Sequence, residues 1–319
     1  MSRRADRFLL LAPFGLLAAA AAGILLGPES LSPPILEMRV LRVLLAAAVG
    51  AALAVAGTIF QAILRNPLAD PYVLGASSGG GLGATIFIVL APATAGALST
   101  WGVPLFAFAG AALAVALVYR LASVGGRIPR MTLLLAGVVI GYLLAGVLLF
   151  IVSTVGSSRL HDVMWWLLGS LQARDPGLVA AAWWCAALGV GATWLLARDL
   201  DLLALGEEQA AHLGLSPERA KRGFFLLGSL LTGAAVAASG LIGFVGLVVP
   251  NLVRLVIGPG HRRLVPCAAF TGAAFLVLVE LASRTALPGR EVPVGVVTAF
   301  VGGPFFLWLL RRQRKVFWG

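Results

Sequence analysis

Ten long apolar runs are the sequence feature that most limits how this chain can fold. About 20 apolar residues in a helix cross a hydrocarbon core of about 30 Å. Charged residues make up only 12% of the chain and apolar residues 60%, whereas soluble domains carry about 25% charged residues. We therefore predict an all-α, polytopic membrane protein with one transmembrane domain, residues 1–319. The ten predicted spans are Phe8–Leu26, Val40–Leu64, Val73–Leu90, Val103–Tyr119, Thr132–Val155, Leu178–Ala197, Gly223–Ser239, Phe244–Ile257, Leu264–Leu281 and Val294–Leu310.

The distribution of basic residues predicts the orientation of these spans, because Lys and Arg are enriched on the cytoplasmic side. A cytoplasmic N-terminus puts 18 of the 24 basic residues inside, makes both termini cytoplasmic, and accounts for the net charge of +11 without nucleic acid. The six outer residues are Arg39, Arg42, Arg159, Arg174, Arg284 and Arg290. Ser2–Gly23 also resembles a signal peptide. Whether residues 1–26 are retained as a helix stays open, because their removal leaves this orientation unchanged.

Two similar stretches indicate internal repetition. Gly50–Gly57 and Gly233–Gly240 are both rich in Gly and Ala, and they lie on spans predicted to run in opposite directions. Inverted repeats of this kind are common in transporters. Chance similarity between two Ala-rich helices is the alternative. In either case, such small residues allow helix backbones to approach closely.

A polar, proline-rich turn interrupts the apolar pattern after the second span. Arg65–Pro71 is followed by the Gly- and Ser-rich run Gly75–Gly81. Exposed backbone near membrane depth is tolerated only where protein or a water-filled cavity satisfies it. We therefore predict that Ser77, Ser78 and Gly79 border a translocation pathway, with helix packing as the alternative.

Two further connections are unusually long. The cytoplasmic loop at about residues 199–221 mixes leucines with acidic groups, which predicts short amphipathic helices that dock a partner at the membrane surface. A solvated connector is the alternative. The outer segment Arg159–Asp175 contains Trp165 and Trp166, a pair more typical of membrane anchoring than of ligand stacking.

Several kinds of chemistry are missing from the sequence. Neither lysine follows a glycine, so there is no Walker A loop for ATP. The three histidines lie in different loops, which argues against a metal site. The only carboxylate predicted within a span, Glu280, lies four residues before Arg284, a spacing suited to an ion pair. Ion-coupled transport is therefore disfavoured, whereas a passive channel stays open.

Several sequence blocks carry a resemblance to a known family. They are Arg39–Gly57, Gln61, Arg65–Pro71, Leu205–Glu207, Gly243–Pro250 and Pro293–Thr298. In order and spacing they resemble the FecCD (BtuC-like) family of ABC-importer permeases. The resemblance implies the BtuC-like permease fold and a homodimer in the bacterial inner membrane. It also implies two separate ATP-binding subunits, which carry ATP and Mg, and a periplasmic or lipid-anchored substrate-binding protein.

The same resemblance implies a transport function without enzymatic activity or a cofactor in this chain. The expected cargo is a bulky metal chelate, with an iron–siderophore first and haem or cobalamin next. One departure bears on haem: the family commonly has Pro-His where this chain has Pro250 and Asn251, although His261 is kept. A secondary transporter or channel without an ATPase is the alternative.

Individual residue roles also follow from the resemblance. The outer arginines Arg39, Arg42 and Arg284 match those that receive acidic residues of the binding protein, in what we expect to be exposed ion pairs. Asn66 and Leu68 match the cytoplasmic gate. The residues that match the coupling helices, which enter a cleft of the ATPase subunit, are Leu205, Gly206, Glu207, Ala211 and Leu213.

Overall fold

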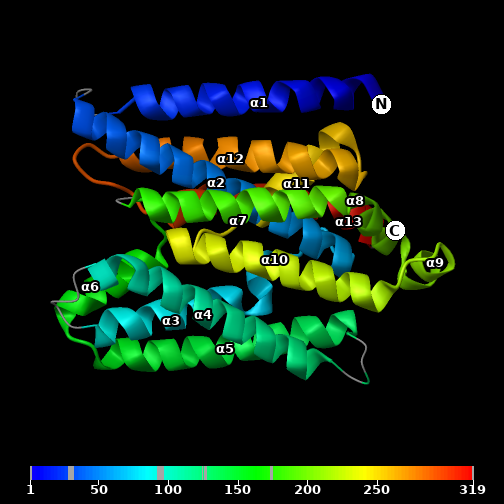
Figure 1. The fold of residues 1–319 in the computed structure, drawn as a ribbon, viewed down its shortest axis with the longest axis horizontal. Helices are drawn as coiled ribbons and strands as arrows, with labels where there is room; N and C mark the ends of the chain where they lie inside the picture. Colours follow the sequence, from blue (N-terminus) through cyan, green and yellow to red (C-terminus); the bar gives the residue numbers. More distant parts are fainter. Residues whose placement is uncertain are drawn as a thin grey trace.

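A computed structural model describes residues 2–27, 32–91, 97–123, 125, 128–172 and 175–317. Arg127 and Arg174, which entered the charge count, lie outside these residues. The described chain is a helical bundle (Figure 1). Its elements are α1 (Ser2–Leu25), α2 (Pro33–Leu64), the 3-10 helix η1 (Pro71–Leu74), α3 (Ala76–Leu90), α4 (Ala97–Ala122), α5 (Arg130–Thr154), α6 (Ser157–Leu167), α7 (Pro176–Leu195), α8 (Ala197–Leu205), α9 (Glu207–His212), α10 (Pro217–Ser239), α11 (Val245–Ile257), α12 (His261–Thr285) and α13 (Val294–Phe317).

Helix lengths and composition confirm the predicted all-helical class. Among the described residues, seven helices (α1, α2, α4, α5, α7, α10 and α12) are long and apolar enough to cross a membrane, and α3, α11 and α13 are shorter apolar helices. Each predicted span falls on one of these helices, but that all ten cross the bilayer stays a prediction. The start of α1 and the short helices α8 and α9 lie toward one end of the bundle, and α6 lies at the other (Figure 1).

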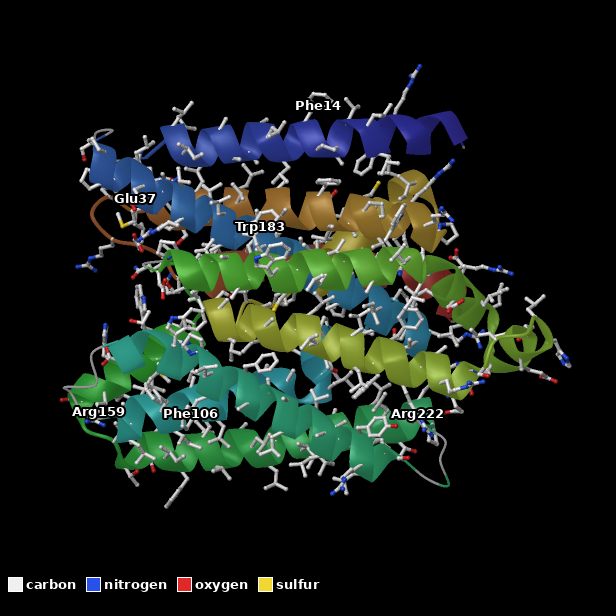
Figure 2. The ribbon with its side chains drawn as sticks, viewed as in Figure 1. Phe14, Glu37, Phe106, Arg159, Trp183 and Arg222 are labelled. Carbon is white, nitrogen blue, oxygen red and sulfur yellow. The ribbon has the colours of Figure 1, made fainter. Side chains whose placement is uncertain are left out.

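Side chains follow the pattern expected of a membrane bundle. Phe14 on α1 points away from the bundle and is exposed (Figure 2). The charged residues Glu37 and Arg159 lie toward the end that carries α6, and Arg222 lies toward the opposite end (Figure 2). Apolar faces between two charged ends are what a bilayer requires.

Helix α2 is the centre of the bundle. In its most apolar stretch 89% of residues are buried, against 11% for α1 and for α5, and α2 packs on α7, α10, α11 and α12. A Cβ added at Gly50 would lie 2.2 Å from the carbonyl oxygen of Gly272, and one at Gly57 would lie 1.8 Å from that of Gly246. These two glycines therefore let the backbones of α12 and α11 touch α2.

The two stretches of the suggested repeat make different contacts. Gly233 on α10 has only ordinary contact distances to Phe108, and Gly240 ends α10 with a φ of 69° beside Trp166. The inverted repeat therefore stays a prediction, while close packing is confirmed for the Gly50–Gly57 stretch.

Two irregular connections meet inside the bundle. After α2 the chain turns at Arg65 (φ 50°) and enters η1, and after α10 it turns at Phe244 (φ 69°) before α11. The Tyr72 hydroxyl joins them: it donates to the carbonyl oxygen of Ile242 at 3.0 Å and accepts from the Ile242 amide at 3.1 Å. The protein itself thus satisfies backbone groups that lipid could not.

Candidate functional site

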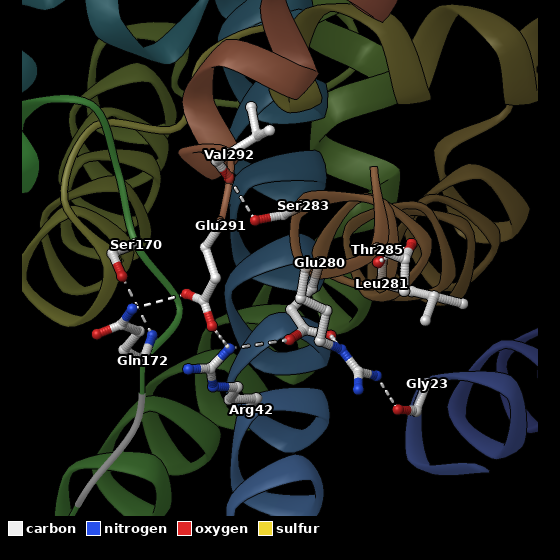
Figure 3. A network of polar contacts seen from close by, with 11 residues as sticks. Gly23, Arg42, Ser170, Gln172, Glu280, Leu281, Ser283, Thr285, Glu291 and Val292 are labelled. Atoms are coloured by element: carbon white, nitrogen blue, oxygen red, sulfur yellow. Dashed lines mark hydrogen bonds and ion pairs between the residues drawn. The ribbon is translucent and has the colours of Figure 1, made fainter. Parts of the chain in front are cut away.

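Arginines and carboxylates form a network where α2 begins and α12 ends (Figure 3). Arg42 Nη1 lies 2.7 Å from Glu291 Oε1 and 3.8 Å from Glu280 Oε1. Arg284 Nε donates to Glu280 Oε2 at 3.2 Å, which confirms the ion pair predicted from the sequence. Gln172 Nε2 donates to Glu291 Oε2 at 2.7 Å. Three parts of the chain that are distant in the sequence, around residues 42, 172 and 280–291, therefore meet at Arg42 and Glu291.

The arginines of this network are turned inward, which corrects the expectation of exposed ion pairs. Arg39 and Arg284 are both buried. Arg39 Nη1 donates to the carbonyl oxygen of Ile24 at 3.2 Å, and Arg284 Nη2 donates to that of Gly23. They are buried because the end of α1 folds over them. Their docking role stays a prediction.

A cavity of about 290 Å³ opens onto this network. Four arginines and one carboxylate lie among its lining residues, so the lining is strongly basic. Burial raises the pKa of Glu291, but hydrogen bonds from Arg42 and Gln172 outweigh burial and hold that pKa below its ordinary value of 4.5. The lining residues are Ile35, Met38, Arg39, Arg42, Arg284, Gly289, Arg290 and Glu291.

The predicted coupling loop forms two short helices, α8 and α9, which protrude at the opposite end of the bundle (Figure 1). Gly206 joins them with a φ of 133°, and a Cβ there would lie 2.3 Å from the Gln209 side-chain oxygen. Leu205, Ala211 and Leu213 are exposed. The prediction of short helices is confirmed, and these three apolar side chains are free of the bundle, as a docking surface requires.

Glu207 has a different position from the other predicted coupling residues. Its Oε1 lies 2.9 Å from Arg130 Nη2 at the start of α5, and its Oε2 lies 3.2 Å from Lys221 Nζ on α10. Lys221 is buried and also pairs with Glu218 at 2.6 Å. Glu207 therefore fixes α9 to the bundle, whereas the leucines face outward.

A second polar contact, which the sequence did not predict, fixes α8. Asp201 Oδ1 accepts from the His261 backbone amide at 2.9 Å and lies 2.6 Å from His261 Nδ1. Burial raises the pKa of Asp201, but its hydrogen bonds to His261 outweigh burial and keep it below 3.8. The coupling segment is thus tied to the first residue of α12 through Nδ1 of the buried His261 ring, whose Nε2 has no hydrogen-bond partner among the described residues.

The predicted gate residues lie in the turn after α2 and are half-buried. Asn66 Oδ1 accepts from the Leu68 amide at 2.9 Å and so shapes the turn. Asn251 on α11 donates to the Pro67 carbonyl oxygen at 2.8 Å, and Arg254 Nη1 donates to Gln61 Oε1. The residue that departs from the family pattern therefore fastens α11 to the gate turn.

The predicted pathway residues divide into two groups. A Cβ at Gly79 would lie 2.4 Å from the Gly110 carbonyl oxygen on α4, so Gly79 allows close packing on α4, while its pathway role stays a prediction. Ser77 and Ser78 are half-buried, and Ser77 Oγ donates to the Tyr72 carbonyl oxygen at 3.4 Å. A pathway role for these serines stays a prediction.

The segment with the tryptophan pair, predicted to lie outside, forms α6 and then an irregular strip over residues 168–172. Trp165 stacks on His161 with ring centroids 6.1 Å apart. After α6, the Ser170 amide donates to the Ser239 carbonyl oxygen at 2.8 Å, and the Gly295 amide donates to that of Leu168 at 3.0 Å. The strip thus links the end of α10 to the start of α13, while membrane anchoring stays a prediction.

Among the residues that the structure describes, no group of three His, Cys, Asp or Glu side chains could hold a metal ion. Four roles in the site were not predicted from the sequence: the contacts of Gln172, Asp201 and Glu291, and the hydrogen bond from Asn251 to the gate turn. The one available signal was an acidic residue beside Arg290, in a short loop predicted to lie outside.

The helical bundle, with an exposed helix pair at one end and a basic cavity at the other, is that of a multi-pass membrane protein. Residues 11–312 match the model of the FecCD transport family. The chain therefore belongs to the FecCD transport family. The match confirms the resemblance and the BtuC-like fold inferred from the sequence blocks.

Three curated relatives and one solved structure are similar to this chain. The cobalamin import system permease BtuC of Halobacterium salinarum is 42% identical, covering 90% of this chain and 75% of the relative. The hemin transport system permease HmuU of Yersinia pestis is 42% identical, covering 88% and 84%. The Fe(3+) dicitrate transport system permease FecD of Escherichia coli is 41% identical, covering 88% and 86%.

The solved structure is described as an inward-facing conformation of a metal-chelate type ABC transporter. It is 28% identical, with a TM-score of 0.87 and coverage of 96% of this chain and 99% of the other. These relatives do not favour the alternative of an ion-coupled carrier or channel. Their nearly equal identities do not rank one cargo above another.

Proposed function

We propose that this chain is the membrane-spanning permease of a binding-protein-dependent ABC importer for a bulky metal chelate. The observation that carries the proposal is the protruding α8–Gly206–α9 segment, which exposes Leu205 and Leu213 while Glu207 and Asp201 fix it to the bundle. Exposed leucines on a segment that ion pairs hold to the bundle suit a contact that transmits movement from an ATPase subunit. The printed names of the relatives support the same conclusion.

The proposed assembly contains two copies of this chain, two ATP-binding subunits that carry ATP and Mg, and one substrate-binding protein. It lies in the bacterial inner membrane with both termini in the cytoplasm. The binding protein docks on the basic cavity at the outer end. Closure of the ATPase pair moves α8 and α9, and the contacts of Glu207 with Arg130 and Lys221 carry that movement to α5 and α10.

For the cargo we propose an iron–siderophore ahead of haem and cobalamin. Haem iron is commonly held by a histidine. Here Asn251 replaces the first family histidine, and the His261 ring is engaged with Asp201. The first of the two positions therefore offers no imidazole to iron, and only the second keeps one, through His261 Nε2. An oxygen-bound ferric chelate needs no such ligand from the pore.

Reconstitution tests this function. The chain is placed in liposomes with an ATPase subunit and a binding protein, and uptake of ferric siderophore, haem and cobalamin is measured with ATP and with a non-hydrolysable analogue. Uptake is expected only with ATP and only with the binding protein. Uptake without ATP would refute the importer proposal. The absorption spectrum of the purified binding protein then distinguishes the three coloured cargoes.

A further inference from the structure

The two carboxylates that contact Arg42 differ in their access to solvent. The Glu280 side chain is 3% exposed and the Arg42 side chain 11%, whereas the Glu291 side chain is 35% exposed. Glu291 also borders the outer cavity, and Glu280 does not. A carboxylate arriving from outside would therefore meet Arg42 on the side that Glu291 already occupies.

We propose that Glu291 is an internal substitute for a carboxylate of the binding protein, and that docking exchanges one for the other on Arg42. The proposal rests on the proposed importer function. It assigns to Glu291 a role in selecting the partner. A docking protein must present a carboxylate opposite Arg42 to displace Glu291, and a surface without one leaves the Arg42–Glu291 pair in place.

The surrounding contacts suit an exchange of partners. Glu280 stays behind Arg42 at 3.8 Å, and Arg284 holds Glu280 at 3.2 Å, so Arg42 keeps a neighbour when Glu291 leaves. Gln172 donates to Glu291 at 2.7 Å and so helps to hold this carboxylate beside Arg42 until it is displaced. Since Arg42 is already largely desolvated, the incoming carboxylate does not bear the full cost of burying that charge.

The chain around Glu291 limits the exchange to a local change. The Val292 amide donates to the Ser283 carbonyl oxygen at 2.8 Å, and the Ser283 hydroxyl donates back to the Val292 carbonyl oxygen. The Val294 amide donates to the Gly169 carbonyl oxygen at 3.1 Å. These bonds hold the backbone after Glu291, so its side chain can leave Arg42 while α13 stays in place.

The test measures docking in the assembled transporter. The probe is the purified binding protein that stimulates ATP-driven uptake by the wild-type transporter, and its affinity is compared for wild type and Glu291→Gln. Removing the internal competitor is expected to tighten docking by about fivefold, the fold-change of a partly exposed ion pair. Glu37→Gln is the matched control, because Glu37 is an exposed carboxylate near the same end of α2 (Figure 2).

The exchange predicts that Glu37→Gln has no effect and that the gain from Glu291→Gln disappears in an Arg42→Gln background. Gln172→Ala, at an exposed position, is expected to give a smaller gain and supplies the answer if Glu291→Gln does not fold. Unchanged or weaker docking by both Glu291→Gln and Gln172→Ala would overturn the proposal. So would an equal gain from Glu37→Gln, which would indicate a general charge effect. If no binding protein docks on the wild type, the importer function itself fails.

Discussion

Replacing Leu213 with alanine tests the proposed contact with the ATPase subunit. The Leu213 residue is 58% exposed at the end of α9. Complete burial of a leucine side chain contributes about 1.5–3 kcal/mol, so burying this exposed part in a partner contributes about 0.9–1.7 kcal/mol. Alanine keeps the Cβ and loses the rest. The expected loss is about 1 kcal/mol, or about fivefold in affinity.

The assay is the dissociation constant of the ATPase subunit on detergent-solubilised permease, followed by the ratio of ATP hydrolysed to cargo imported. Leu188→Ala is the matched control, because Leu188 is 68% exposed on α7, within the membrane span. It is expected to bind the ATPase subunit like the wild type. Wild-type affinity for Leu213→Ala, or an equal loss for Leu188→Ala, would refute the assignment of this surface.

Three further changes test the fold and the site. Gly50→Ala is expected to destabilise the protein by about 1–3 kcal/mol, since the new Cβ would lie 2.2 Å from a carbonyl oxygen of α12. The loss of stability is measured by thermal unfolding in detergent. Gly191→Ala, whose Cβ would meet nothing within 4 Å inside helix α7, should be at least as stable as the wild type. Asn251→Ala removes the donor to the gate turn and is expected to raise cargo-independent ATP hydrolysis, so an unchanged basal rate would argue against a gating role. Because folding lowers the pKa of Asp201 below 3.8, its contact with His261 contributes its full stability above pH 3.8 and loses it as the pH falls through the lower folded value. In Asp201→Asn, the free energy of unfolding should fall less steeply than in the wild type as the pH is lowered below 3.8. An unchanged pH dependence would contradict this role of Asp201.

The helices could be predicted from the sequence because a bilayer imposes both a length and a composition on each span. Helix ends were predicted less well. Helix α10 begins at Pro217 rather than at Gly223, since hydropathy marks the hydrocarbon region while a helix continues through charged turns outside it. Proline at the first helical position also favours this earlier start.

The side-chain contacts of the site could not be predicted in the same way. Arg42 and Glu291 are 249 residues apart, and Asp201 and His261 are 60 apart, so no local pattern connects them. Charge counting grouped Arg39 with Arg42, and the two do line the same cavity, but it contains no information about the burial of Arg39 beneath α1. The exposure of a side chain depends on how the helices pack against one another, and the pattern of apolar residues along the sequence does not specify that packing.

Helix α2 is one uninterrupted rod of 32 residues, about 48 Å long at 1.5 Å per residue. Its tightest contact with α12, at Gly50, divides the rod unequally, with Arg42 about 12 Å to one side and Leu64 about 21 Å to the other. If α2 tilts about Gly50, that contact acts as a fulcrum. A sideways displacement of 1 Å at Arg42 then becomes about 1.75 Å at Leu64, in the opposite direction. For such a tilt, the position of Gly50 sets the ratio between the displacements at these two residues.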